Sequence, residues 1–138
     1  MRVEQGVLRI ETAGRELLDI TAKVAVWLAE ARLVKGSLTL FCRHTSAGLL
    51  ISENASSAVK RDLLRWLGDV VPEGAGYEHD DEGPDDMPAH IKAMLTGSAL
   101  TVPFAGNWLL LGTWQAIYLA EHRARSHRRE IVLTAIGE

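Results

Sequence analysis

The sequence has 138 residues, 47% hydrophobic and 24% charged, which is the composition of one globular domain of ordinary size. Its net charge of −3 argues against general nucleic-acid binding, and no stretch has the roughly 20 apolar residues of a membrane-spanning helix. The single Cys42 excludes an intramolecular disulfide and a four-cysteine zinc site. Because no uninterrupted apolar run follows the first residues, we expect no signal peptide and a cytoplasmic protein.

Two elements are predicted in the first part of the chain. Residues 3–10 have the pattern of a strand, and apolar residues at helical spacing within residues 20–31 predict a helix with one buried stripe. Asp19 or Thr21 can cap this helix, and Gly36 is expected to break it.

The next stretch, residues 41–54, carries more polar side chains than a buried strand usually holds. Strand alternation from residue 38 onward puts several of them on one face. That polar face comprises His44, Ser46, Ser52 and Asn54. A strand with such a face is either solvated there or lines a pocket.

After residue 54 the period becomes helical, with Ser56 or Ser57 as the N-cap and Gly68 as the residue that closes the helix. Residues 69–86 lack periodicity and contain eight acidic residues but no Lys or Arg. A loop of this length in a small domain is usually functional or disordered.

A short helix follows the acidic loop. Asp86 is expected to cap it, Pro88 lies in its first turn, and Gly97 stops it. The remainder predicts strands over residues 100–103, 108–113, 115–119 and 130–136, with a turn at 105–107. This order is not the strict alternation of a doubly wound sheet. We therefore expect one compact α+β domain over residues 1–138, with a largely antiparallel sheet or sandwich and helices packed on a face.

Three histidines are candidates for chemistry, and each also has a structural explanation. His44, at the end of an apolar strand, can simply be hydrogen-bonded there, and His79 can be a solvated loop residue. His90 falls in a first helical turn, where the helix dipole favours the neutral imidazole that binds metal or acts as a base. Asp86 precedes His90 by four residues and shares its helix face, unless the carboxylate serves as the helix cap.

These histidines do not form a compact metal-binding motif, but they can assemble a site for zinc or another divalent ion in space. The acidic loop alternatively offers oxygen ligands to magnesium. Gln115 offers a hydrogen-bond donor and acceptor beside Trp114, although the pair also fits a strand corner with a core tryptophan. Arg128 and Arg129 can hold a phosphate or can be solvated charges of a hairpin.

Several of these stretches together resemble the YjbQ family of small bacterial and archaeal proteins. The matching segments, in the family's order, are His44-Thr45-Ser46-Ala47, Glu53-Asn54, Tyr77-Glu78-His79-Asp80, residues 85–92, Gly112-Thr113-Trp114-Gln115, Glu121-His122-Arg123 and Gly137-Glu138. The resemblance implies a compact α+β fold, a homotrimer and a cytoplasmic protein. Some members of the family have a secondary thiamine-phosphate synthase activity, which joins hydroxymethylpyrimidine diphosphate to thiazole phosphate with loss of diphosphate.

The resemblance also implies roles for individual residues. His44, His79 and His90 are expected to converge as metal ligands or acid–base groups, within one chain or across a trimer interface. The expected catalytic residues are His44, Glu53, Asp86, His90 and Glu121, of which the carboxylates orient the histidines or accept protons. The expected substrate contacts are Ser46, Asn54, Gln115, Arg128 and Arg129, with an arginine on the phosphate.

Two other function classes remain open from the sequence. The first is a non-enzymatic protein that binds a small molecule or a metal, with the histidines lining the ligand site. The second is an interaction module in which the basic residues 123–129 bind nucleic acid, with the steep salt dependence of phosphate contacts. We expect the partners to be a phosphorylated small molecule and other copies of the chain, and we expect no binding to nucleic acid or membranes.

Overall fold

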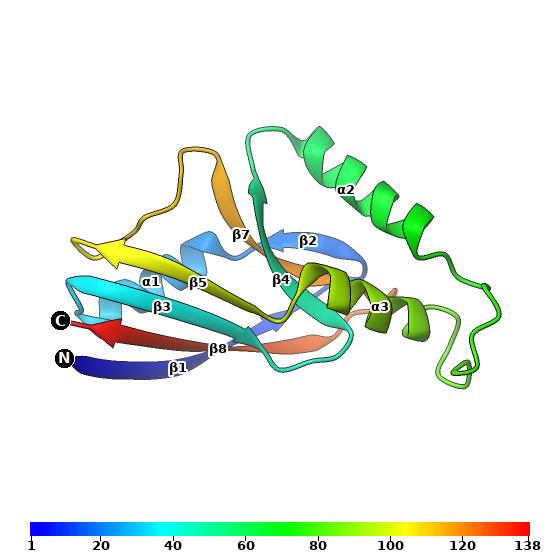
Figure 1. The fold of residues 1–138 in the computed structure, drawn as a ribbon, viewed down its shortest axis with the longest axis horizontal. Helices are drawn as coiled ribbons and strands as arrows, with labels where there is room; N and C mark the ends of the chain where they lie inside the picture. The colour runs from blue at the N-terminus through cyan, green and yellow to red at the C-terminus, as the bar shows by residue number, and fades with distance from the viewer.

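Eight strands and three helices form the computed structural model, which describes residues 1–138 (Figure 1). In chain order the elements are β1 (Arg2–Glu11), β2 (Glu16–Asp19), α1 (Thr21–Ala31), β3 (Lys35–Cys42), β4 (Ala47–Glu53), α2 (Ser57–Val70), α3 (Asp86–Thr96), β5 (Ala99–Ala105), β6 (Trp108–Leu109), β7 (Gln115–Glu121) and β8 (Arg128–Gly137). A five-stranded sheet has the order β1-β8-β3-β5-β6, and a three-stranded sheet has the order β2-β7-β4. All pairings are antiparallel. The predicted α+β class with antiparallel pairing is confirmed.

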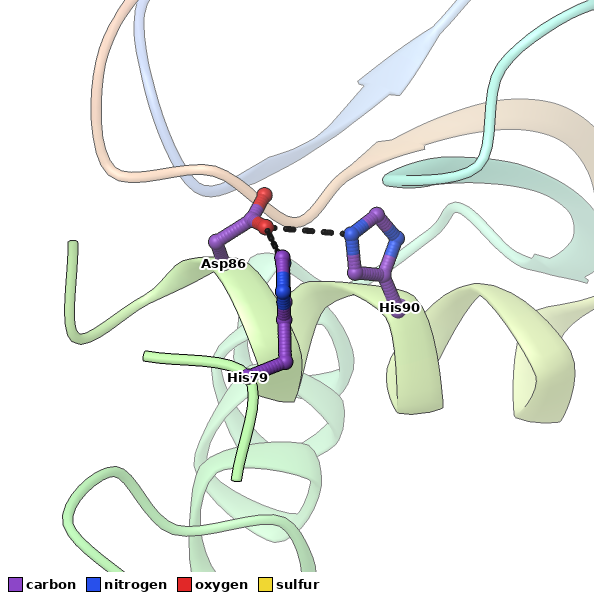
Figure 2. A group of neighbouring side chains, drawn as sticks. All are labelled: His79, Asp86 and His90. Carbon is purple, nitrogen blue, oxygen red and sulfur yellow. Dashed lines mark hydrogen bonds and ion pairs between the residues drawn. The ribbon is translucent and has the colours of Figure 1, made fainter. Parts of the chain in front are cut away.

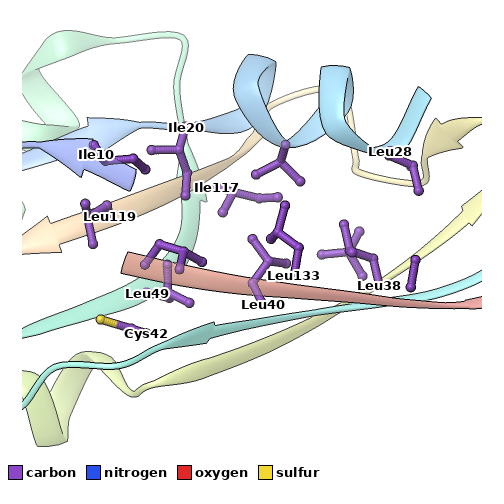
Figure 3. Close-up of a cluster of buried hydrophobic side chains, with 14 of the residues drawn as sticks. Ile10, Ile20, Leu28, Leu38, Leu40, Cys42, Leu49, Ile117, Leu119 and Leu133 are labelled. Carbon is purple, nitrogen blue, oxygen red and sulfur yellow. The ribbon is translucent and has the colours of Figure 1, made fainter. Parts of the chain in front are cut away.

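The main hydrophobic core lies between the inner faces of the two sheets and α1 (Figure 3). Strand alternation turns Leu38 and Leu40 of β3 inward, and Leu40 pairs in register with the buried Leu133 of β8. Val24 and Leu28 of α1 are fully buried against them. Burying one such side chain contributes about 1.5–3 kcal/mol, so this core fixes how the two sheets sit together.

The other two helices pack on the three-stranded sheet. Leu63 and Leu64 of α2 cover its second face over Leu17 and Tyr118. α3 lies along β4, where the Leu49 amide donates to the Gly97 carbonyl at 2.9 Å. Gly48 permits this approach, since an added Cβ would lie 2.6 Å from the Gly97 oxygen. The first turn of α3 is thereby held near the start of β4 and the end of β7.

The outer face of the five-stranded sheet carries no helix. Register places Val3, Ile136, Ser37 and Pro103 side by side on this face, and Phe41 lies further along it. Phe41 and Ile136 are each 47% exposed. We call this surface the uncovered sheet face. None of the three helices combines the length and apolarity needed to cross a membrane.

The predicted strand through His44 is wrong. β3 ends at Cys42 and β4 begins at Ala47, so His44 and Ser46 lie in the connection between them. The chain leaves the five-stranded sheet here and enters the three-stranded sheet, and no single alternation can run through such a crossing.

Several predicted helix and strand boundaries are also shifted. α1 ends at Arg32, which adopts a left-handed conformation with φ of 55°, and Gly36 already belongs to β3. α2 continues through Gly68 to Val70, so that glycine does not end the helix. Asp85 is the N-cap of α3, and Asp86 is its first helical residue. The predicted strand over residues 108–113 shrinks to the two residues of β6.

Candidate functional site

Two of the three candidate histidines meet one carboxylate at the start of α3 (Figure 2). Asp86 and His90 lie one turn apart on this helix, and His79 reaches them from the connection between α2 and α3. His79 Nε2 lies 2.7 Å from Asp86 Oδ2, and His90 Nε2 lies 3.1 Å from the same oxygen. The two imidazole centroids are 5.8 Å apart. Two ring nitrogens therefore face a single carboxylate oxygen.

A hydrogen bond on its far side fixes the tautomer of His90. Its Nδ1 lies 2.8 Å from the Thr45 carbonyl oxygen, which can only accept, so Nδ1 carries a proton. In the neutral ring, Nε2 then presents a lone pair to Asp86 Oδ2. Two lone-pair atoms at 3.1 Å repel unless a proton or a metal ion lies between them. A histidine that donates from its other nitrogen to a carbonyl is also the usual arrangement of a metal ligand.

An arginine orients the carboxylate. Asp86 Oδ1 accepts from Arg123 Nη1 at 2.7 Å, and the Arg123 Nε donates to Asp85 Oδ2 at 2.9 Å. Asp85 also accepts from the Ala124 amide, and its pKa is lowered to about 2 because the bonds from Ala124 and Arg123 outweigh its desolvation. This arrangement occupies one oxygen of Asp86 and leaves the other free for the histidines.

Asp86 is buried while His79 is exposed, and the pKa values of both are shifted by their contact. Asp86 is 3% exposed, and its desolvation is outweighed by His79, His90 and Arg123, so its pKa stays below the ordinary value. The hydrogen bond to Asp86 is the main reason that the pKa of His79 is raised. The carboxylate is thus ionised at neutral pH, and cations are favoured beside it.

More carboxylates surround His79 on its solvent side. Glu82 Oε2 lies 3.2 Å from its Nε2, and Asp81 Oδ1 lies 3.5 Å from its Nδ1. A cavity of about 750 Å³ opens beside them, with Tyr77 and Met87 in its wall. This negative surrounding favours a cation and disfavours an anion that arrives without one.

The donor set fits a transition-metal ion. The ligand atoms of His79, Asp86 and His90 all lie within 4.8 Å of one another. Donors on one tetrahedral zinc ion stand about 3.3 Å apart, given bonds of about 2.0–2.1 Å. Two imidazoles and one carboxylate suit zinc or a similar ion and leave a position for water or substrate. His79, Asp81 and Glu82 form an alternative set that is richer in oxygen.

His44 is not part of this group. Its Nε2 accepts from the Glu130 amide at 2.7 Å, so the lone pair that would bind a metal is already used. Burial, and then the charge of Arg129, lower the pKa of His44 and keep the ring neutral. Its neighbour Thr45 contributes to the site through the backbone carbonyl that holds His90.

Glu121, Arg129 and Ser46 form a separate buried cluster. Arg129 Nε donates to Glu121 Oε1 at 2.8 Å, and its Nη2 donates to the other carboxylate oxygen and to Ser46 Oγ. Thr12 adds a hydroxyl donor to Glu121. Arg129 outweighs the desolvation of Glu121, and the pKa of that carboxyl is lowered. The polar atoms of this cluster bond to one another within the protein.

The remaining predicted site residues lie elsewhere. Glu53 of β4 pairs in register with Gln115 of β7. This pair lies six residues along β4 from the Ala47–Glu121 pair, so about 20 Å separates the two pairs at 3.3 Å per residue. Gln115 Oε1 accepts from the Gly112 amide, and Asn54 bonds through its backbone to Trp114. Arg128 forms an exposed ion pair with Glu11. Within one chain, none of these four joins the two histidines on Asp86.

Two residues of the site did not emerge as such from the sequence. Asp85 appears in the sequence analysis only within the matching residues 85–92, and Arg123 only within a matching segment and the basic residues 123–129. The signal for Asp85 is its place before Asp86 at a helix start, where only one of two adjacent carboxylates is needed as a cap. For Arg123, the signal is its place directly after the apolar strand β7, while residues 69–86 contain eight acidic residues and no Lys or Arg.

The comparisons with known proteins agree with this fold. A sequence model described as "UPF0047 protein YjbQ-like" matches residues 6–138. The chain is 42% identical to a UPF0047 protein of Synechocystis, over 99% of this chain and 94% of that relative. A crystal structure of a YjbQ/UPF0047 protein from Clostridium acetobutylicum superposes with a TM-score of 0.88 at 36% identity, over 95% and 99% of the two chains. A hypothetical protein from Aeropyrum pernix gives 0.89 at 28% identity, over 98% and 99%. The chain therefore belongs to the UPF0047 family of YjbQ-like proteins.

Proposed function

We propose that His79, Asp86 and His90 bind one divalent metal ion, with zinc as the best match. The observation that supports this most is the contact of two imidazole nitrogens with one ionised oxygen. The Thr45 carbonyl holds the proton of His90 on Nδ1, so that the neutral ring offers its Nε2 lone pair. Magnesium fits the oxygen-rich set of Asp81 and Glu82 better. In this assignment His44 is not a ligand.

We further propose that the metal site acts on a phosphorylated small molecule, as in the thiamine-phosphate synthase activity that the family resemblance implies. In that reaction a C–N bond forms between the two heterocycles, and the C–O bond to diphosphate breaks. A bound divalent ion supplies stabilisation of the negative charge on the departing diphosphate. Arg123 holds Asp86 in place, and the Thr45 carbonyl holds His90. A pocket that brings the two substrates together accounts for a weak, secondary rate.

The test begins with metal binding. Wild-type protein loaded with zinc and dialysed should retain one ion per chain by elemental analysis, and His90→Ala should retain none. His44→Ala is the matched control and should bind zinc as wild type does, because its Nε2 is occupied by the Glu130 amide. Retention of zinc by His90→Ala, or its loss in His44→Ala, contradicts the assignment.

The second measurement separates an enzyme from a binding protein. Thiamine phosphate formation is followed for zinc-loaded wild type, His90→Ala and His44→Ala. The transferase proposal expects activity in wild type and His44→Ala and its loss in His90→Ala. If wild type and His44→Ala each hold one zinc ion but form no thiamine phosphate, the alternative of a non-enzymatic metal-binding protein is favoured.

We also propose that the protein acts as a homotrimer in the cytoplasm, as the resemblance implies. The uncovered sheet face supports self-association, because Phe41, Val3 and Ile136 expose apolar area there. Sedimentation equilibrium should give three times the mass of the 15.1 kDa chain. Phe41→Glu should yield monomers, and a monomeric wild type refutes the proposal.

A further inference from the structure

A second cavity, of about 320 Å³, lies between α2, α3 and the end of β7. None of the three proposed metal ligands lines this cavity. Its polar lining comes from Arg15, Arg65, Lys92, Glu121 and His122. Four of these five residues are basic, in contrast to the acidic surroundings of His79.

Lys92 is the most unusual of them. It is 5% exposed and takes part in no ion pair or side-chain hydrogen bond. Lysines are almost never this buried without a partner, because an isolated ammonium loses its hydration. Among the polar side-chain atoms that the protein encloses fully, only Glu53 Oε2 lacks a hydrogen-bond partner. The Lys92 amine also lacks a partner, so it is not fully enclosed and keeps some contact with solvent. Because Lys92 lines the cavity, we infer that its amine reaches solvent there.

The acidic groups nearby are committed to other cations. Glu121 is held by Arg129 and by the Thr12 hydroxyl. Outside the cavity, Glu73 pairs with Arg15 at 2.8 Å, and Asp85 pairs with Arg123. The unneutralised charge inside the cavity is therefore positive and belongs to Lys92.

The neighbouring His122 does not cancel this charge or add to it. Its Nε2 lies 3.0 Å from Thr96 Oγ1, and that hydroxyl lies 3.1 Å from the Lys92 carbonyl oxygen, to which it donates. The imidazole then donates from Nε2, which leaves Nδ1 as an acceptor without a partner. Burial, followed by the charge of Lys92, lowers the pKa of His122 to about 4, so the ring is neutral at pH 7.

We propose that this cavity binds the phosphate group of a small molecule, with Lys92 as its main contact and Arg15 and Arg65 at the entrance. Both arginines are partly exposed and belong to surface ion pairs that an incoming dianion can compete for. The neutral Nδ1 of His122 can accept from a protonated phosphate oxygen. A volume of about 320 Å³ holds a phosphate together with a small organic group.

This inference does not require the metal site, and it moves the phosphate from Arg128 and Arg129 to Lys92. Arg129 is enclosed with Glu121, and Arg128 lies on the surface beside Glu11. A phosphorylated substrate of the metal site could use this cavity, but a phosphate ester that never meets the metal would bind it equally well.

The experiment is calorimetric titration of the full chain with inorganic phosphate and with phenyl phosphate, each at constant ionic strength. Lys92→Met keeps the aliphatic stem and removes the charge, and it should weaken binding by roughly 10–100-fold, as expected for one charge-assisted bond. Lys23→Met, an exposed lysine on α1, is the matched control and should bind as wild type does. Binding of either probe that depends on Lys92 supports the site, and the stronger of the two tells free phosphate from an ester.

The fold of the variant is checked by urea denaturation. Lys92→Met should be at least as stable as wild type, because it removes a buried charge without a partner. Equal phosphate affinity in wild type and Lys92→Met overturns the proposal, as does the absence of saturable binding in wild type. Phosphate binding that needs zinc and disappears in His90→Ala, but not in Lys92→Met, also overturns it and assigns the anion to the metal site. Lys92→Met should retain zinc as wild type does, so a failure of the phosphate proposal can be told from a failure of the metal proposal.

Discussion

Asp86 and Glu121 are both buried carboxylates, 3% and 1% exposed, and each is held by an arginine. Their other contacts differ. Both oxygens of Glu121 are bonded to fixed donors, namely Arg129 and Thr12, with the Arg123 amide in addition. Asp86 has one oxygen on Arg123, while the other faces two histidine rings.

The histidines on Asp86 reach solvent, with side chains 40% and 30% exposed for His79 and His90. A ligand can therefore enter between these rings and the carboxylate, whereas the Glu121 cluster is closed and already satisfied. Completed hydrogen bonding is typical of a structural role, whereas a carboxylate oxygen shared by two partly exposed imidazoles is typical of a binding site. We call His79, Asp86 and His90 the open cluster, and Glu121, Arg129, Ser46 and Thr12 the closed cluster. We expect the closed cluster to contribute stability and the open cluster to carry the proposed metal site.

The largest expected effect is on stability at the closed cluster. Glu121→Ala leaves Arg129 buried without its partner, which should lower the free energy of unfolding by about 3–5 kcal/mol. Urea denaturation monitored by tryptophan fluorescence measures this loss. Glu11→Ala is the matched control, because the exposed pair with Arg128 is worth about 0–1 kcal/mol. If both variants lose a similarly small free energy of unfolding, Glu121 contributes no more to stability than an exposed ion pair does.

The next effect is on metal affinity at the open cluster. Arg123→Gln releases the carboxylate of Asp86, and groups that orient a metal ligand typically change affinity by about 10–100-fold. Competition with a chromophoric chelator gives the dissociation constant of zinc. Arg125→Gln, an exposed residue two positions along, should leave it unchanged. If Arg123→Gln binds zinc as tightly as wild type, the arginine does not position Asp86 for a metal.

The sequence alone predicts that Asp86 and His90 of the open cluster lie side by side. Asp86 and His90 lie four residues apart on a helix that Pro88 and Gly97 delimit, so their shared face follows from helical geometry alone. The contact with His79 could not be predicted, because it depends on the path of a loop without periodicity. The antiparallel α+β class followed from the order of elements, which local patterns largely determine.

The closed cluster was beyond sequence reasoning for a different reason. Glu121 ends β7 and Arg129 is the second residue of β8, yet these consecutive strands belong to different sheets. Their contact bridges the two sheets at one end of the core. His44 was misjudged at the same place, since β3 and β4 also belong to different sheets and the alternation stops between them. Alternation describes one sheet at a time and carries no information about how two sheets meet.

The smallest expected effect is a pH dependence that only the open cluster shows. The hydrogen bond to Asp86 outweighs desolvation, and with the charges of Asp81 and Glu82 it raises the pKa of His79 above 6.5. The protonated ring therefore stabilises the metal-free fold fully below pH 6.5, and this contribution is lost as pH rises through the folded-state pKa.

In the proposed metal site zinc would compete with that proton for His79, so the affinity for zinc should increase over the same pH range. Urea midpoints of metal-free wild type should fall across this window, and His79→Gln should flatten the change. His127→Gln changes a histidine that lies beside Glu121 and contacts no residue of the open cluster, so it serves as the control and should follow wild type. A midpoint that changes identically in His79→Gln and wild type would mean that Asp86 gains nothing from His79. The open cluster would then be no more responsive than the closed one.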